Sequence, residues 1–260
     1  MFRILQLTDL HVFHDAMTTL KGVPTRELLR DVVNFIAASG QTFDAVIVTG
    51  DHTHDELPES YQAVRQLLLP RVDRVFLVPG NNDERNFMRT VFGDRITGPN
   101  DELIQFSFGA GSWLCIGLDT HVPGAVAGRI DSAQIDWARD LVGRSSASQV
   151  ALFFHHPPVL MNSDWMDAIG LEGRDLLMRW FQSDSRVRLV CCGHVHHEFQ
   201  HRLGQVDILT TPSTGIQFAP EGSTPNMVAG PPGYRVIDLL DDGFSTRVIR
   251  LPEIRFRPVV

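Results

Sequence analysis

The sequence predicts an α/β fold in which helices cover the faces of a sheet. Short apolar runs rich in β-branched residues alternate with amphipathic helical patterns over the first 192 residues. The composition is that of a globular protein, with 43% hydrophobic and 21% charged residues in a chain of 260. Strands that alternate with helices are typical of a sheet with helices packed on it.

Six apolar runs are the expected strands, at residues 2–8, 45–49, 74–79, 113–118, 149–154 and 187–192. Four helices are expected, at residues 25–38, 60–69, 131–142 and 172–183. The first helix has an apolar stripe that includes Leu28, Leu29 and Val32, and Asp131 is a good capping residue for the third.

The last quarter of the chain has a different pattern. Residues 206–210, 234–239 and 244–251 look like strands without helices between them, and glycine and proline are dense from 212 to 233. We therefore expect a long irregular loop and a second, more antiparallel sheet. No repeat or linker pattern divides the chain, so one domain over residues 1–260 is expected.

Charge and cysteine content exclude several classes of protein. The 23 basic and 31 acidic side chains give a net charge of −8, which argues against nucleic acid or an anionic membrane as a partner. The three cysteines form no disulfide framework, and no run approaches the roughly 18 apolar residues of a membrane span. The first residues lack the pattern of a secretory signal, so we expect a cytoplasmic protein.

Polar groups that can bind metals follow five of the six apolar runs. In chain order they are Asp9-Leu10-His11, Gly50-Asp51, Gly80-Asn81-Asn82-Asp83, His155-His156-Pro157-Pro158 and Gly193-His194-Val195-His196. Any one of them alone is ordinary turn or cap chemistry. Five of them after five strands form a pattern, and the carboxyl ends of strands in an open α/β sheet lie close together.

Seven side chains are the candidate metal ligands: Asp9, His11, Asp51, Asn81, His155, His194 and His196. Imidazole and oxygen donors without a thiolate suit Fe, Mn or Zn. Seven donors are too many for one tetrahedral ion and suit two ions that share a carboxylate. Two ions about 3.5–4 Å apart form a clamp for in-line displacement at phosphorus.

The order of these motifs resembles that of the calcineurin-like metallophosphoesterases. Four more stretches resemble the bacterial class III 3′,5′-cyclic-AMP phosphodiesterases within that family, at residues 50–55, 128–131, 192–199 and 211–218. The resemblance extends from residue 2 to about residue 251. It implies a single-domain, four-layer αββα sandwich.

The resemblance also implies how the ligands divide between the two ions. Asp9, His11 and His196 would bind the first ion, Asn81, His155 and His194 the second, and Asp51 both. His156 also fits the spacing of the motif, so it remains an alternative to His155. Asn81, Asn82 and His196 are expected to contact the substrate.

One position departs from the family pattern. Members usually have Gly-Asn-His-Asp, whereas this chain has Asn82 in place of the histidine. An amide donates a hydrogen bond but is no acid near pH 7, and general acid catalysis typically contributes about 10²–10⁴-fold. Three outcomes follow: Asn82 serves as a donor beside the metals, another histidine takes the role, or the site binds without turnover. The candidate replacements are His52, His54, His156 and His197.

The predicted activity is hydrolysis of 3′,5′-cyclic AMP to 5′-AMP, with Asp51 and Asn82 as the catalytic residues. A hydroxide that bridges the two ions would attack phosphorus in line with the 3′ oxygen. The alternatives are a phosphodiesterase for 2′,3′-cyclic nucleotides or glycerophosphodiesters, and a non-catalytic scaffold that binds metal and nucleotide. A homodimer is plausible, and Phe218 is a candidate for stacking on a base.

A competing motif occurs at His197-Glu198-Phe199-Gln200-His201, which has the zinc-protease spacing H-E-x-x-H. That chemistry needs both histidines on one face of a helix. The segment follows an expected strand and precedes another, so a loop and a hairpin arm are expected here instead.

Overall fold

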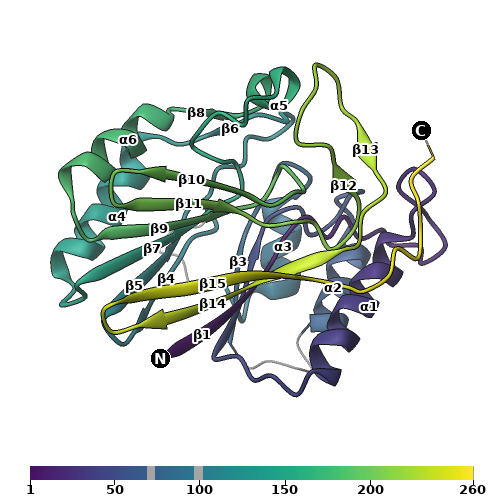
Figure 1. Cartoon of the computed structure of the whole chain (residues 1–260), viewed down its shortest axis with the longest axis horizontal. Helices are drawn as coiled ribbons and strands as arrows, with labels where there is room; N and C mark the ends of the chain where they lie inside the picture. Colours follow the sequence, from purple (N-terminus) through teal and green to yellow (C-terminus); the bar gives the residue numbers. More distant parts are fainter. Residues whose placement is uncertain (69–73, 97–101, 260) are drawn as a thin grey trace.

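Two sheets form the centre of the molecule in the computed structural model, which describes residues 1–68, 74–96 and 102–259 (Figure 1). The first sheet has the strand order β15 (Gly243–Arg250), β14 (Gly233–Leu240), β1 (Phe2–Leu7), β2 (Ala45–Thr49) and β3 (Val75–Val78). The second has the order β10 (Phe199–Leu203), β11 (Val206–Thr210), β9 (Val187–Cys192), β7 (Gln149–Phe153), β5 (Trp113–Gly117) and β4 (Phe106–Ala110).

Helices cover the outer face of each sheet. The first sheet packs against α1 (Thr25–Ala38), α2 (Pro58–Leu68) and α3 (Arg85–Phe92), and the second against α4 (Ser132–Arg144) and α6 (Arg174–Ser183). A third apolar cluster lies between the sheets and contains side chains of both, among them Ile4, Phe153 and Ile237. The protein is therefore the expected four-layer αββα sandwich.

The alternation along β1 explains how one strand serves two layers. Ile4 faces the second sheet, whereas Leu5 and Leu7 face the helices. Successive side chains of a strand point to opposite faces, so a strand between two apolar layers needs apolar residues at nearly every position. This is why the expected strands appeared as continuous apolar runs.

The expectation of a second sheet built from the end of the chain was wrong. β14 and β15 join the first sheet, where β14 pairs antiparallel with β1, and β11 joins the second sheet parallel to β9. The six earlier runs also divide, three to each sheet. Pairing partners such as Ile4 and Ile237 are far apart in the sequence, and an apolar pattern does not specify which strands become neighbours.

Several elements lay outside the sequence pattern. α3 and β4 were not predicted, whereas β10 is the hairpin arm that was expected after residue 197. The loop from 212 to 233 contains a small pair of strands, β12 (Gln217–Phe218) and β13 (Met227–Val228). Another short pair joins β6 (Gly128–Arg129) and β8 (Leu171–Glu172), close to the short helix α5 (Asp164–Ala168). The helix expected at 60–69 begins at Pro58, and Leu69 lies outside the described residues. No helix within the described ranges is long and apolar enough to cross a membrane.

Candidate metal centre

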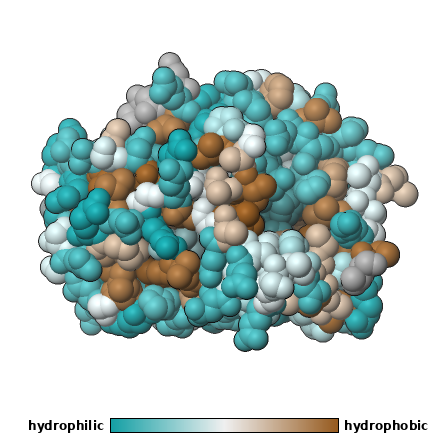
Figure 2. All heavy atoms as spheres, turned by 90° about the horizontal axis from the view of Figure 1, so that it is seen from above, coloured by the Kyte–Doolittle hydropathy of each residue, from teal (hydrophilic) through white to brown (hydrophobic). Residues whose placement is uncertain are grey.

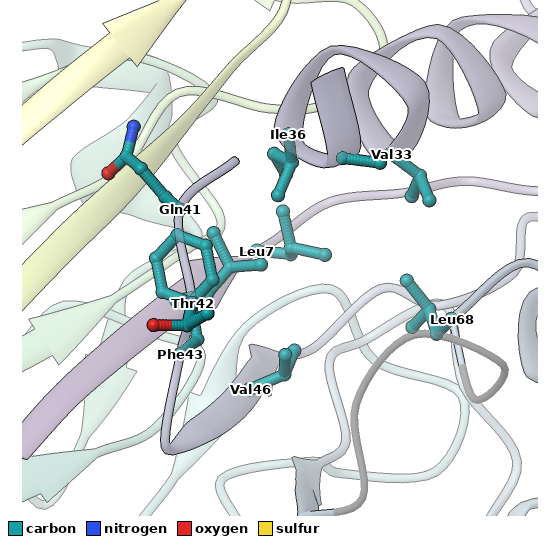
Figure 3. Close-up of a pocket in the computed structure, with 10 residues that line it drawn as sticks. Leu7, Val33, Ile36, Gln41, Thr42, Phe43, Val46 and Leu68 are labelled. Atoms are coloured by element: carbon teal, nitrogen blue, oxygen red, sulfur yellow. The ribbon is translucent and has the colours of Figure 1, made fainter. Parts of the chain in front are cut away.

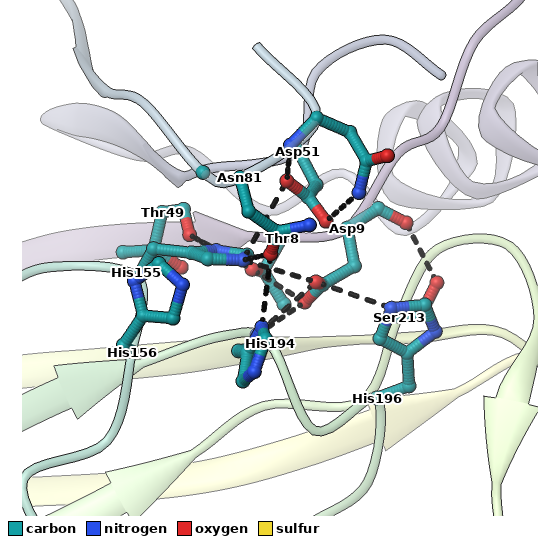
Figure 4. A network of polar contacts seen from close by, with 12 residues as sticks. Thr8, Asp9, Thr49, Asp51, Asn81, His155, His156, His194, His196 and Ser213 are labelled. Carbon is teal, nitrogen blue, oxygen red and sulfur yellow. Dashed lines mark hydrogen bonds and ion pairs between the residues drawn. The ribbon is translucent and has the colours of Figure 1, made fainter. Parts of the chain in front are cut away.

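The seven predicted ligands gather where strands of both sheets end. Figure 4 labels all of them except His11. Asp9 and His11 follow β1, and Asp51 and Asn81 follow β2 and β3. His155, His194 and His196 approach from the second sheet, after β7 and β9. The site therefore lies at the carboxyl ends of parallel strands, as the sequence predicted.

Most of the predicted ligands have an uncommon backbone conformation with positive φ. Of the eight non-glycine residues with positive φ in the described chain, five are predicted ligands: Asp9 (54°), His11 (46°), Asp51 (52°), His194 (71°) and His196 (56°). A left-handed conformation costs a non-glycine residue about 1–3 kcal/mol and is concentrated at functional sites. The chain therefore turns sharply where β1, β2 and β9 end, which directs the polar groups there inward.

Gly50 is required for one of these turns. Its φ is 95°, and a Cβ atom there would lie 2.4 Å from Nδ1 of His155. Only glycine fits both the conformation and the close approach.

The first donor cluster comprises Asp9, His11, Asp51 and His196, all buried. Nε2 of His11 lies 3.1 Å from Nε2 of His196 and 3.4 Å from Oδ2 of Asp51. Nε2 of His196 lies 3.2 Å from Oδ1 of Asp9. Four donor atoms from three strand ends thus face one another within one small volume.

The second donor cluster comprises Asn81, His155 and His194. Oδ1 of Asn81 lies 3.3 Å from Nε2 of His155 and 3.1 Å from Nδ1 of His194. Nε2 of His155 also lies 3.6 Å from Oδ1 of Asp51. The two oxygens of Asp51 therefore face different clusters, which is the geometry of a shared carboxylate.

The donor spacing fits metal ions. Donors bound at about 2.0–2.2 Å to one ion lie about 2.8–3.6 Å apart in octahedral or tetrahedral arrangements. The separations of 3.1, 3.2 and 3.4 Å in the first cluster fall in this range, as do those of 3.1 and 3.3 Å in the second. The residues present are thus suited to two ions.

Hydrogen bonds to backbone carbonyls orient three of the imidazoles. Nδ1 of His155 donates to the carbonyl of Thr49 (2.7 Å), and Nδ1 of His196 donates to that of Ile216 (2.9 Å). Nε2 of His194 donates to the carbonyl of Ile169 (3.1 Å). A carbonyl only accepts, so in each ring the other nitrogen presents its lone pair to the cluster.

His156 has no lone pair left for a metal. Its Nε2 donates to the carbonyl of Val126 (3.0 Å), and its Nδ1 accepts from the hydroxyl of Thr120 (2.8 Å). Although His156 lies within ligand distance of His155 and His194, both of its nitrogens already have partners. The hydrogen bonds therefore favour His155, a choice that the motif spacing left open.

Several buried carboxylates and imidazoles lie close together in the site and shift one another's pKa values. Burial alone would raise the pKa of Asp9, but the imidazoles of His196, His155 and His11 outweigh it and hold that pKa well below its usual value. Burial raises the pKa of Asp51 to about 6 and lowers that of His194 to about 3. Burial would lower the pKa of His196, but the carboxylates of Asp9 and Asp51 outweigh it and raise that pKa. A metal ion binds ionised carboxylates and neutral imidazoles, so metal ions and protons compete for this site.

Outer hydrogen bonds hold the two carboxylates. The hydroxyl of Thr8 donates to Oδ2 of Asp9 (2.7 Å), and the backbone N–H of His194 lies 3.1 Å from both of its oxygens. Asn82 donates to Asp51 twice, from its backbone N–H (2.8 Å) and from its side-chain amide (2.9 Å). Asn82 thus positions the shared carboxylate, a role that the sequence did not reveal.

A buried network fixes the loop that carries Asn81 and Asn82. Asp83 accepts from the backbone N–H of Gly80 (2.9 Å), from the ring of His52 (2.9 Å) and from the hydroxyl of Tyr61 (3.1 Å). Sequence reasoning missed this role of Asp83 and Tyr61. The feature of the sequence that could have indicated it is the position of Asp83 at the end of the motif Gly80-Asn81-Asn82-Asp83.

A cavity of about 220 Å³ opens over the donor clusters. Its polar lining comprises His11, Asp51, His54, Asn81, Asn82, His194 and His196. Of the four histidines considered as replacements at position 82, His54 is the one in this lining. The ring of His52 faces Asp83, that of His156 faces Thr120 and Val126, and that of His197 faces the carbonyl of Val195.

A second cavity, of about 250 Å³, lies between α1 and the first sheet (Figure 3). Its lining is apolar apart from Gln41 and Thr42, and includes Leu7, Val33 and Phe43. None of the described residues that line it is titratable or binds metals. The smaller cavity over the donor clusters is therefore the candidate active site.

The competing protease motif does not form a metal site. Phe199–Leu203 is strand β10, paired antiparallel with β11, and His201 is exposed on it. The ring of His197 is buried at the preceding turn. The two histidines thus do not share a helix face, as the sequence context predicted.

A four-layer αββα sandwich with these donor clusters at its strand ends defines a metallophosphoesterase. The chain belongs to the calcineurin-like phosphoesterase family, whose model matches residues 2–198. This family uses a dinuclear metal site, in accordance with the two donor clusters.

Curated relatives match nearly the whole chain. It is 34% identical to 3′,5′-cyclic adenosine monophosphate phosphodiesterase CpdA of Pseudomonas aeruginosa over 254 residues, which cover 97% of this chain and 91% of the relative. It is 29% identical to CpdA of Escherichia coli K12 over 257 residues, with 98% and 92% coverage. A 3′,5′-cyclic-nucleotide phosphodiesterase of Nostoc is 29% identical, with 96% and 92% coverage.

Solved structures agree on the fold. A dimetal phosphatase from Danio rerio superposes with a TM-score of 0.69 at 14% identity and covers 100% of this chain and 96% of that one. The yellow lupin purple acid phosphatase PPD1 gives 0.73 at 12% identity, with 98% and 52% coverage.

Proposed function

We propose that the protein is a dinuclear metal-dependent phosphodiesterase that hydrolyses 3′,5′-cyclic AMP to 5′-AMP. The observation that carries the proposal is the orientation of Asp51, whose two oxygens face two separate donor clusters on the floor of one cavity. The printed activities of the relatives from Pseudomonas and Escherichia support the choice of substrate. The compartment and a homodimer remain predictions.

The ligands divide between two ions in this proposal. Asp9, His11 and His196 hold one, Asn81, His155 and His194 hold the other, and Asp51 contacts both. Two ions there would polarise the phosphodiester oxygens and lower the pKa of a shared water. All seven donors are oxygen or imidazole nitrogen, which suits Fe, Mn or Zn.

Asn82 acts on the substrate through its amide. One N–H of its side chain donates to Asp51, and the second is left for an oxygen of the phosphodiester. A donor held in place before the reaction stabilises charge that develops on phosphate in the transition state. Asn82 therefore combines positioning of the shared carboxylate with recognition of the phosphoryl group.

His54 is the side chain that we assign to the 3′ leaving oxygen. It lines the cavity, and its Nδ1 lies 3.2 Å from Nδ1 of His11. If His11 binds metal through Nε2, its Nδ1–H donates to His54, and Nε2–H of His54 remains free to donate to a substrate oxygen. This hydrogen bond would partly take over the role of the histidine that family members usually have in place of Asn82.

Product analysis tests the proposal. Manganese-loaded protein would be incubated with 3′,5′-cyclic AMP, 2′,3′-cyclic AMP and glycerophosphocholine, and the products separated by phosphorus NMR, with Asp51→Asn as the blank. Selective, Asp51-dependent formation of 5′-AMP from the 3′,5′-cyclic substrate is expected. If only one of the other two substrates is hydrolysed, the protein is a phosphodiesterase with a different substrate. If none of the three is hydrolysed, a non-catalytic scaffold is favoured.

A further inference from the structure

The side of the cavity away from the strand ends is apolar. Four side chains form it: Leu20 from the loop before α1, Trp165 from α5, Phe218 from β12 and Met227 from β13. We call these four the apolar wall. Figure 2, which looks onto the face that carries α5 and the β12–β13 pair, shows hydrophobic residues grouped near its middle among hydrophilic ones.

Phe218 joins the apolar wall to the metal centre. Its ring centroid lies 4.4 Å from that of His196 at an interplanar angle of 38°. On its other side Trp165 meets it edge-on, with centroids 5.2 Å apart and an angle of 76°. A group bound at the phosphoryl position beside His196 therefore has an aromatic surface directly next to it.

The apolar wall is supported from behind. Leu20, Phe218 and Met227 pack in one cluster with Val23, Leu28, Ile216 and Phe256, and Phe256 comes from the C-terminal segment. Arg255, next to it, is paired with Glu27 and Asp31 of α1. The C-terminal segment thus packs in the same cluster as three of the wall side chains, which holds the ring of Phe218 in place before a ligand binds.

The polar and apolar linings of the cavity are segregated. Every polar side chain that lines its described part belongs to the metal centre, to Asn82 or to His54. The remaining lining is Leu20, Val126, Trp165, Ile169, Ile216, Phe218 and Met227. The strong hydrogen-bonding group among the four wall side chains is the indole N–H of Trp165, which is buried and has no partner in the described chain. The exposed surface of the wall therefore offers stacking rather than hydrogen bonds to a base edge.

We propose that the apolar wall binds the nucleoside base of the substrate through stacking and shape, so that the enzyme accepts cyclic adenosine and guanosine phosphates with little discrimination. The inference rests on the proposed phosphodiesterase function, and it states which part of the substrate the wall binds. A flat aromatic base matches two rings and two flexible apolar side chains. A glyceryl group has no such face.

The specificity follows from the absence of polar contacts in the wall. A site that hydrogen-bonds a substrate group rejects an analogue lacking it by about 10⁴–10⁵-fold, whereas an apolar pocket discriminates by only about 10–200-fold. We therefore expect the kcat/KM values for 3′,5′-cyclic AMP and 3′,5′-cyclic GMP to differ by less than about 200-fold. A larger ratio would overturn the inference, because it would require polar readout of the base.

Removing the aromatic face tests the role of Phe218. Phe218→Leu keeps apolar bulk in the supporting cluster but removes stacking, so kcat/KM for cyclic AMP should fall by about 5- to 150-fold. Hydrolysis of base-free 1-deoxyribose 3′,5′-cyclic phosphate should fall less in this variant than hydrolysis of cyclic AMP, because that substrate has no base to stack. Phe218→Tyr should restore the activity on cyclic AMP, and Phe87→Leu, on the exposed face of α3, is the control.

A binding measurement separates this inference from the proposed function. Calorimetric titration with 5′-AMP and with ribose 5-phosphate needs no turnover, and the base should strengthen binding by about 5- to 150-fold in the wild type and far less in Phe218→Leu and Trp165→Leu. Equal losses for both ligands, or equal affinities in the wild type, would refute the wall as a base site. If no cyclic phosphate is hydrolysed but 5′-AMP still binds through its base, the proposed function fails and the inference stands.

Discussion

Replacing Gly193 by alanine should damage the metal centre and the sandwich together. Gly193 follows β9 and lies against the ends of β1 and β2. A Cβ atom there would be 2.0 Å from the hydroxyl oxygen of Thr8, 2.8 Å from Oδ2 of Asp9 and 2.9 Å from the carbonyl oxygen of Thr49. No side chain fits into this contact unless the strands move apart.

The cost can be worked out from these contacts. To reach an ordinary contact of 3.4 Å the Thr8 oxygen would have to recede by 1.4 Å, the difference between 3.4 and 2.0 Å. That movement breaks its 2.7 Å hydrogen bond to Asp9. Overpacking costs about 1–3 kcal/mol and a lost bond to a charged group about 1.5–3 kcal/mol, so Gly193→Ala should lower the free energy of unfolding by about 2.5–6 kcal/mol.

Two assays and a matched control test this prediction. Urea unfolding gives the stability, and calorimetric titration with Mn²⁺ gives the metal affinity, which should fall by about 10–100-fold because an outer partner of Asp9 is lost. Gly143→Ala is the control, since nothing lies within 4 Å of its Cβ position in α4, and it should stabilise the protein by about 0.5–1 kcal/mol. Wild-type stability and metal affinity in Gly193→Ala would refute the reasoning.

Three further predictions concern the ligands, the departure at position 82 and pH. His155→Gln should reduce bound manganese from two ions to one, whereas His156→Gln should retain two, as measured by equilibrium dialysis with metal analysis; equal losses would return His156 to the ligand set. Asn82→His should speed hydrolysis of cyclic AMP more than that of bis-nitrophenyl phosphate, because only the poor leaving group needs a proton donor; equal rate changes would contradict this. The hydrogen bond from Arg3 (2.5 Å) lowers the pKa of Asp238, so its stabilisation is present above the ordinary value near 4 and lost as pH falls through the lowered pKa. Unfolding between pH 2 and 7 should show Asp238→Asn less stable by about 1–3 kcal/mol at neutral pH and equal to the wild type at the acid end; a constant gap would count against the ion pair.

The sequence by itself determined the elements that carry the site. The run that became β9 is apolar because both of its faces are buried, and Gly193-His194-Val195-His196 follows it because the backbone must turn where the strand ends. Donor type and strand position are local properties, so they can be predicted from residue order. This local information carried the resemblance to the family, and the resemblance in turn implied the four-layer fold.

Only the tertiary structure decided which groups face one another. The choice between His155 and His156 depends on the carbonyls of Thr49 and Val126, which come from other segments of the chain. The contacts of Asn82 with Asp51 likewise appear only once β2 and β3 lie side by side. A residue's type and neighbours in sequence fix what it can donate or accept, whereas its partners are fixed by long-range strand pairing, which an apolar pattern leaves open.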